Sequence, residues 1–267
     1  MRWSLYVLLL TGLLAACVSK TPPLRQSDIP LPEVAIEIPA AVEQEVPTDE
    51  ITEEALVMDT RTRKLRFFAL LRPLVQAENA RILKLRQHLL ALQKQAGAYS
   101  KDQLRDFRVW AQHYRVPLIG KPQSSFWAHL LKRVDVVPLE LALAQAANES
   151  AWGTSRFSRQ GNNFFGQWCF KKGCGLVPTR RNSSATHEVK VFASPDESVR
   201  AYIHNLNTTG VYRSLRGIRL HLRRAKQPLD AMLLASGLFA YSERGAAYVK
   251  SIRKIIRRNR ALMLSAG

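Results

Sequence analysis

The chain has 267 residues, with 40 Lys and Arg against 21 Asp and Glu, so its formal net charge is +19. This length allows one or two domains with a sizeable core, and a hydrophobic content of 46% excludes wholesale disorder. Because a long apolar run occurs only within the first twenty residues, a multi-span membrane protein is excluded, and the excess positive charge predicts an anionic partner.

Residues 1–16 are predicted to be a signal peptide. Arg2 precedes a mostly apolar stretch, Leu5–Leu14, which is too short to span a bilayer stably. The segment Leu14–Cys17 resembles the lipobox of bacterial lipoproteins, which is cut before the Cys that carries the lipid. We therefore predict lipidation of Cys17. The alternative is an ordinary signal peptide in which this Cys occurs by chance.

The residue after Cys17 is Val18, and by the rule of the lipoprotein family a residue other than Asp implies the outer membrane. The resemblance thus implies a protein held by lipid on the periplasmic face of the outer membrane of a Gram-negative-type bacterium. Such a protein meets the cell wall and lipid phosphates, so nucleic acid is not an expected partner. The sequence names no protein partner.

The lipidated Cys and the segment that follows, residues 17–60, are predicted to form an acidic tether. Residues 18–60 hold ten acidic and two basic residues, six of the 13 prolines and no glycine. This composition is typical of an extended, self-repelling chain that would give the rest of the protein reach. Residues 61–267 carry a net charge of +26, so the tether could instead fold back onto them.

Residues 61–121 are predicted to form helices that pack on the domain that follows, residues 122–267. Apolar residues recur with a helical period from Leu65 to Val75 and again from Ile82 to Leu92. Pro73 predicts a break or bend between these stretches. A third helix is expected around Leu104–Ala111, and none of the three carries evident chemistry.

Residues 122–267 are predicted to be mostly helical with one short strand, so the expected fold class is α+β. Pro138 is well placed to begin a helix that ends near Ser150, and Ser194 to cap another. Between them, residues 187–192 alternate in polarity as a strand does. A terminal helix is expected over Ala246–Arg260.

Export would place Cys169 and Cys174 in an oxidising compartment, where a disulfide that closes a small loop is expected. The rival is half of a zinc site, but no second pair of ligands has suitable spacing, and His187 stands alone. The six His residues show no ligand spacing, so no metal and no cofactor are predicted.

Glu149 is the candidate catalytic acid. It ends a helix, Leu139–Asn148, that is mostly apolar and has almost no other charge. Burial beside a core and the negative end of a helix both favour a protonated carboxyl, and a general acid needs such a raised pKa. The alternative is a solvated or salt-bridged Glu at a helix end.

The residues after Glu149 are rich in Gly, Asn and aromatic side chains, which offer close backbone approach, hydrogen bonds and faces for stacking sugar rings. They could equally form a tight turn packed with aromatic rings. The candidate substrate contacts are Trp152, Asn162, Asn163, Phe165, Gln167 and Trp168.

The segments Ala144–Gly153 and Asn162–Gly166 resemble the bacterial glucosaminidase family, glycoside hydrolase family 73. The segment Asn163–Gly175, and Tyr241–Gly245 with Tyr248, resemble its Bax-like branch. The resemblance covers about residues 60–267. It implies a lysozyme-like catalytic domain with a small β-hairpin lobe, over residues 122–267.

The family's activity is hydrolysis of the β-1,4 bond after N-acetylglucosamine in peptidoglycan. The resemblance implies that Glu149 is the catalytic acid and that Glu188, in the hairpin lobe, is the second acidic group. It also implies a Tyr near the site. Tyr241 is preferred for this role, because Tyr248 also fits an inward-facing helix stripe and is kept as a substrate contact.

Several mechanisms and functions remain open at this point. Two carboxyl groups about 5–5.5 Å apart would permit a retaining reaction, and about 6.5–9.5 Å an inverting one. The substrate's acetamide could instead be the nucleophile, with Tyr241 steadying the charge. The rival functions are a muramidase or lytic transglycosylase, and an inactive scaffold that binds the cell wall. The basic run Arg213–Arg224 is expected to be a solvated face or a substrate groove.

Overall fold

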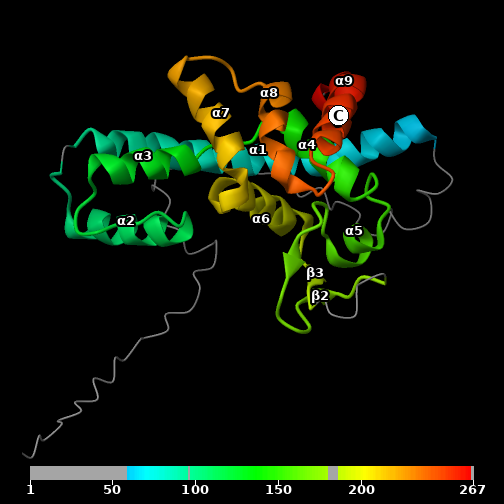
Figure 1. The fold of residues 1–267 in the computed structure, drawn as a ribbon, viewed down its shortest axis with the longest axis horizontal. Coiled ribbons are helices and arrows are strands. Elements are labelled where there is room, and N and C mark those ends of the chain that lie inside the picture. The colour runs from blue at the N-terminus through cyan, green and yellow to red at the C-terminus, as the bar shows by residue number, and fades with distance from the viewer. Residues whose placement is uncertain (1–58, 96, 180–185, 266–267) are drawn as a thin grey trace, which may run out of the picture.

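The structure, a computed structural model, describes residues 59–95, 97–179 and 186–265. The expected fold class, α+β and mostly helical, is confirmed, and a small sheet lies to one side of the helices (Figure 1). The elements are α1 (Thr60–Gln93), α2 (Lys101–His113), α3 (Ser124–Arg133), α4 (Leu139–Glu149), α5 (Arg156–Gly161), β1 (Trp168–Cys169), β2 (Gly175–Leu176), β3 (Glu188–Lys190), α6 (Pro195–Thr208), the 3-10 helix η3 (Gly210–Tyr212), α7 (Arg213–Arg224), α8 (Ala231–Ala235), the 3-10 helix η4 (Ser236–Tyr241) and α9 (Ala246–Leu264).

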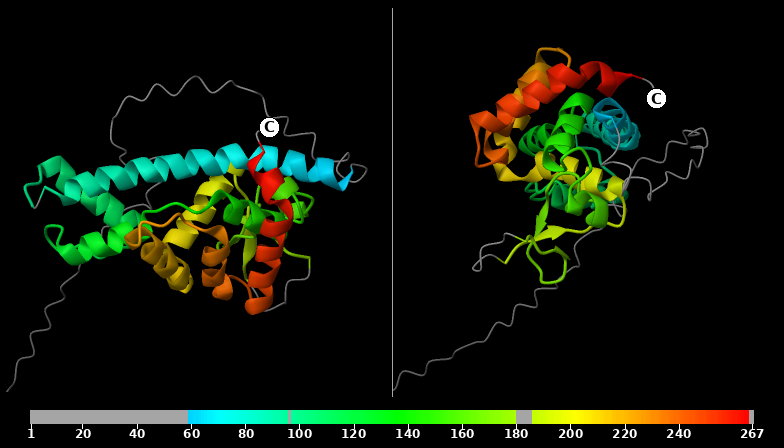
Figure 2. Two further views of the ribbon diagram at one scale, coloured as in Figure 1. Left: turned by 90° about the horizontal axis from the view of Figure 1, so that it is seen from above. Right: turned by 90° about the vertical axis from the view of Figure 1, so that its right-hand side faces the viewer.

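α1 is one helix of 34 residues that runs along the whole body (Figure 2). Of the break or bend predicted at Pro73, the break does not occur, although this residue lies inside the helix and cannot donate a backbone hydrogen bond. The reason is packing. The two apolar stretches form one continuous face, in which Phe68 and Val75 before the middle, and Leu85 and Leu89 after it, are all buried. Burial of that face outweighs the lost bond.

α4 lies at the centre of the core. Its residues Leu141–Ala147 are all buried, and it packs against α9, α1 and α8. A helix buried on every side must be apolar all round, as the sequence of this one is. α9 presents Tyr248, Ile252 and Ile256 to the core. Ile255 is only half-buried.

The β lobe is a three-stranded sheet in which β3 lies between β1 and β2 and runs antiparallel to both. Val189 is opposite both Trp168 and Leu176, so the register is shared. Cys169 and Cys174 form a disulfide with Cα atoms 6.2 Å apart, which closes the turn after β1. β3, which lies within the strand predicted over residues 187–192, is therefore the central strand of a sheet.

The basic run of α7 is partly internal, which corrects the expectation of a wholly solvated face, although Arg213 and Arg224 are exposed. Arg216 and Arg219 are 3% and 1% exposed. Arg219 donates to four backbone carbonyls between Lys132 and Val136 and lies 3.8 Å from a carboxylate oxygen of Asp135. A guanidinium has five donors, so it can satisfy the loop before α4 from inside the core.

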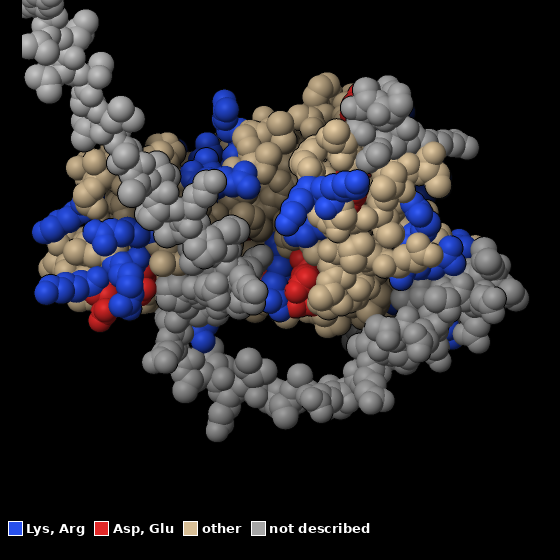
Figure 3. Space-filling model, turned by 90° about the horizontal axis from the view of Figure 1, so that it is seen from below, with Lys and Arg blue, Asp and Glu red and all other residues tan. Residues whose placement is uncertain are grey.

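Asp135 is nearly buried and is shared by three arginines, Arg86, Arg219 and Arg223. Burial alone would raise its pKa, but the hydrogen bond from Arg223 and the three positive charges hold the pKa below its usual range. Elsewhere, basic side chains are spread over the face drawn in Figure 3, and acidic ones occur in only a few places.

The helical region of residues 61–121 shares the core of residues 122–267, since one apolar cluster runs from Phe67 to Met263. In the part of the chain that the structure describes, no helix has both the length and the apolarity to cross a membrane. The predicted signal peptide, Cys17 and nearly all of the tether lie outside the described residues.

Candidate active site

Glu149 is the last residue of α4 and is half-buried. The amide of Asn148 donates to one of its carboxylate oxygens at 3.1 Å. The turn at Gly166 lies against the other, because a Cβ built on this glycine would be 3.6 Å from Glu149 Oε2. The carboxyl group is therefore held between the end of α4 and the Asn162–Trp168 segment.

The turn directly after Glu149 is strained. Ala151, Trp152 and Gly153 have φ values of +52°, +63° and +80°, and the first two are not glycine. Such residues cost about 1–3 kcal/mol each and persist where the surrounding structure holds them. Ser150 does so here, since its hydroxyl donates to Ala146 O at 2.7 Å and accepts from Gly153 N at 2.9 Å. α4 consequently ends abruptly at Glu149.

A chain of buried polar side chains leads from the core to Glu149. The Tyr202 hydroxyl donates to Gln145 Oε1 at 2.7 Å, and Gln145 Nε2 donates to the Tyr248 hydroxyl at 3.0 Å. A side-chain hydrogen bond joins Tyr248 to Glu149, with the hydroxyl as donor. Because every link but the last is fully buried, this chain fixes where the carboxyl group lies.

Burial raises the pKa of Glu149. The hydrogen bonds from Asn148 and Tyr248, and the positive charge of Arg244, oppose this rise without cancelling it. The direction agrees with the sequence-based expectation for a general acid.

Of the two tyrosines that the sequence singled out, Tyr248 and not Tyr241 is the one bonded to Glu149. Tyr248, which was kept as a substrate contact, is 1% exposed and bonds Glu149 directly. The half-buried Tyr241 stacks on the ring of Tyr248, with centroids 5.2 Å apart, and its hydroxyl donates to Phe165 O at 3.0 Å. Tyr241 thus contacts the site through Tyr248 and Phe165, and its catalytic role stays a prediction.

Glu188 is buried in the β lobe, where it begins β3. One carboxylate oxygen accepts from Gly173 N at 3.0 Å and the other from Gly175 N at 2.8 Å. Its oxygen and the sulfurs of Cys169 and Cys174 lie within 4.8 Å of one another, but the sulfurs are joined in the disulfide. Glu188 holds the disulfide loop, and its role as second catalytic group stays a prediction.

Three predicted substrate contacts form the scaffold of the site. The Asn163 amide nitrogen donates to Gln167 O and Lys190 O, and its oxygen accepts from two backbone amides, so it joins the active-site turn to β3. Asn162 ends α5 in the left-handed conformation and donates to Phe192 O. Phe165 is 2% exposed and stacks on Tyr202.

The other predicted contacts differ in how open they are. Trp152 packs edge-on against Phe67 and Phe68, with the Lys64 ammonium over its ring. Trp168 is 58% exposed and stacks on His187 with ring centroids 4.0 Å apart. Gln167 Nε2 is buried without a hydrogen-bond partner among the described residues. Trp168 is therefore the most exposed of these three, whereas Gln167 Nε2 is closed to solvent.

Comparison with known proteins identifies the family of the chain. Residues 125–261, slightly more than half of the chain, match the glucosaminidase family model, described as mannosyl-glycoprotein endo-β-N-acetylglucosaminidase. The chain belongs to this glucosaminidase family. It is also similar to protein Bax of Escherichia coli (strain K12), with 36% identity over 186 residues, which cover 70% of this chain and 66% of the relative. The chain thus spans just under two thirds of that relative, and no solved structure matches it.

Membership of the glucosaminidase family supports the predicted class, a glycoside hydrolase of peptidoglycan. Sequence reasoning missed Gln145, Tyr202 and Arg244. Gln145 left a signal, because it is the one polar residue of the apolar stretch Leu141–Ala147 and lies four residues before Glu149, which puts it on the same face. Arg244 lies in the Tyr241–Gly245 segment that carries the resemblance, but only the fold brings it and Tyr202 near Glu149.

Proposed function

We propose that this protein hydrolyses the glycan strands of peptidoglycan after N-acetylglucosamine, with Glu149 as the general acid. The observation that carries the proposal is the state of this carboxyl group. It is half-buried, fixed by Asn148 and Tyr248, and has a raised pKa. A raised pKa keeps more of the group protonated near neutral pH, ready to protonate the oxygen of the leaving sugar.

Trp168 and Gln167 are proposed to bind the glycan. An exposed aromatic ring offers a flat face to a sugar ring, and Trp168 is held in place by its stacking on His187. Gln167 Nε2 is a buried donor with no protein partner among the described residues, so it could donate to an acetamide carbonyl of the substrate.

The bonds of Glu188 favour one of the open mechanisms. Both of its oxygens already accept backbone N–H groups of the disulfide loop, which makes the carboxylate a weaker and less mobile nucleophile. We therefore favour attack by the acetamide oxygen of the substrate on the anomeric carbon. Glu149 protonates the departing oxygen in this step, and water then opens the cyclic intermediate.

The proposed site of action is the periplasmic face of the outer membrane, with the protein held by lipid on Cys17. This part of the proposal rests on the lipobox-like sequence alone. An acidic tether between the lipid and the enzyme would let the active site reach the cell wall.

The experiment is digestion of purified cell-wall sacculi by Glu149→Gln. We expect activity to fall at least about 100-fold, because a general acid contributes about 10²–10⁴ to the rate. The matched control is Glu140→Gln, at the other end of α4, where the carboxylate pairs with Arg260. Near-normal digestion by a folded Glu149→Gln protein would refute the assignment.

The new ends released by the wild type identify the bond that is cut. Mass spectrometry should find N-acetylglucosamine at the reducing ends. N-acetylmuramic acid there would indicate a muramidase, and anhydro ends a lytic transglycosylase. Intact sacculi with bound protein would favour the rival function, a scaffold that binds the cell wall.

A further inference from the structure

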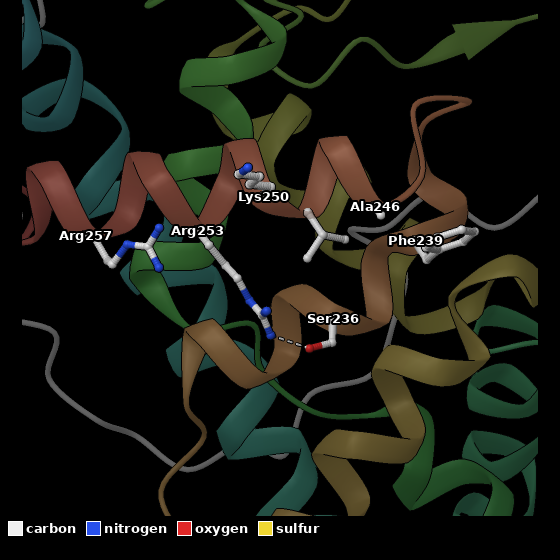
Figure 4. A pocket seen from close by; sticks show the side chains of 7 residues that line it. Ser236, Phe239, Ala246, Lys250, Arg253 and Arg257 are labelled. Carbon is white, nitrogen blue, oxygen red and sulfur yellow. Dashed lines mark hydrogen bonds between the residues drawn. The ribbon is translucent and has the colours of Figure 1, made fainter.

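A pocket lies on the side of α9 that faces away from Glu149. It has a volume of about 460 Å³ and is formed between η4 and the first three turns of α9 (Figure 4). Three cationic side chains, Lys250, Arg253 and Arg257, line it from α9. Their spacing of three and four residues places all three on one face of the helix.

The positive charge of this pocket is not neutralised from within. Among the residues that the structure describes, none of the three cations has an acidic partner. Arg253 is held at the base of the pocket, since it donates to Met232 O at 3.0 Å and to the hydroxyl of Ser236. Lys250 and Arg257 are exposed at the sides, free to meet an anion.

The pocket also has an apolar wall. Phe239, from η4, is 62% exposed, and Val249 lies across from it on α9. An exposed phenyl ring beside three cations favours a ligand that carries carboxylates next to small apolar groups. It fits a bare inorganic anion less well, because such an ion would leave the ring in water.

The same two elements form this pocket and the active site. Tyr248 lies on the opposite face of α9 and bonds Glu149, while Tyr241, two residues after Phe239, stacks on Tyr248. A ligand in the pocket is therefore separated from the reacting glycan only by the start of α9 and the end of η4.

We propose that this pocket binds the carboxylate-bearing stem peptide of peptidoglycan. The stem peptide combines alanine methyl groups with free carboxylates, which matches a wall of Phe239 and Val249 beside three cations. The inference rests on the proposed function, and it adds that the enzyme recognises the peptide as well as the sugar.

The test compares two double variants of α9. Lys250→Gln/Arg257→Gln removes the two exposed cations of the pocket and leaves Arg253, whose bonds support the fold. Lys254→Gln/Arg258→Gln removes two exposed cations of the same helix that do not line the pocket. Both change the net charge by the same amount, so screening and general attraction to the wall are matched.

The substrates are intact sacculi and glycan strands stripped of peptide by an amidase. We expect the pocket variant to lose about tenfold in kcat/KM on intact sacculi, as two exposed ion pairs imply, and nothing on stripped strands. The control variant should match the wild type on both. An equal loss on both substrates, or the same loss in the control, would overturn the proposal.

A binding measurement separates this proposal from the proposed function. Calorimetry with released stem peptides should show binding to Glu149→Gln that disappears when Lys250→Gln/Arg257→Gln is added, whether or not the wild type cuts glycan. Absence of binding to Glu149→Gln would refute the peptide site. If the pocket variant instead loses only binding to vesicles with anionic headgroups, the pocket faces the membrane and the proposal fails.

Discussion

Replacing Tyr248 by Phe removes one hydroxyl group that makes two hydrogen bonds. The hydroxyl donates to Glu149 and accepts from Gln145 Nε2. Tyr248 is 1% exposed and Gln145 is fully buried, so water does not replace the bond between them. We expect the free energy of unfolding to fall by about 1–3 kcal/mol, the cost of leaving a buried donor without a partner.

The second effect of Tyr248→Phe is on the pKa of Glu149. Burial raises this pKa, and the bond from Tyr248 opposes the rise because it stabilises the carboxylate. A hydrogen bond to a charged group contributes about 1.5–3 kcal/mol, and one pKa unit corresponds to about 1.4 kcal/mol. Because Glu149 is only half-buried, water replaces part of the bond, and we expect its pKa to rise by about one unit.

The pH dependence of kcat/KM measures this change. A general acid must be protonated, so activity is lost as the pH rises through the pKa of Glu149. A higher pKa therefore moves the alkaline limb of the profile to higher pH, by about one unit. The control is Tyr202→Phe, which leaves Gln145 Oε1 without its donor but does not touch the bond to Glu149. An alkaline limb of folded Tyr248→Phe at or below the wild-type position would refute the reasoning.

Two further predictions concern Glu188 and Asp135. Glu188→Gln should lower activity partially at every pH and make the disulfide loop easier to proteolyse, because one oxygen that accepts a backbone amide is lost. If the variant instead lost only the acidic limb of the pH profile, the result would support a catalytic role for Glu188. Asp135→Asn should destabilise the protein by about 3–5 kcal/mol at pH 7, since it leaves the buried Arg219 without a carboxylate. The pKa of Asp135 is lowered in the fold, so its contribution is present above the unfolded pKa of about 4 and is lost as the pH falls through the folded pKa. Urea unfolding should thus show the difference from wild type narrowing at pH 3, and a constant difference would contradict this account.

The helices could be predicted because their apolar residues recur with a helical period, which local sequence records. The break expected at Pro73 does not occur, because a tertiary effect outweighs the local signal there. A proline is a local signal against a helix, but burial of residues on both sides of it is a tertiary effect that the local signal does not contain. Sequence pattern alone predicted one strand of the β lobe, and the hairpin was expected only from the family resemblance, since β1 and β2 have two residues each and show no alternation of their own.

The same distinction applies to the site. Glu149 was predictable because a carboxylate at the end of an uncharged helix is conspicuous in the sequence alone. Its partners were not, because Tyr202 and Tyr248 are far from Gln145 in sequence and meet it only in the folded core. Tyr248 was kept as a substrate contact because it also fits a buried stripe, and in the structure it is both buried and hydrogen-bonded to Glu149.

The net charge of +26 over residues 61–267 counts every cation equally, but the fold does not. Burial lowers the pKa of Arg219 to about 10, and its donors are already committed to backbone carbonyls and Asp135. Such a cation stabilises the fold and adds little to the attraction of a partner. Lys250 and Arg257 differ because they are exposed, line a cavity and have no acidic partner among the described residues. The net charge therefore overstates what is available to an acidic polymer. In our proposal, Lys250 and Arg257, on the outer face of α9, hold the polymer's carboxylates on the helix whose opposite face carries Tyr248.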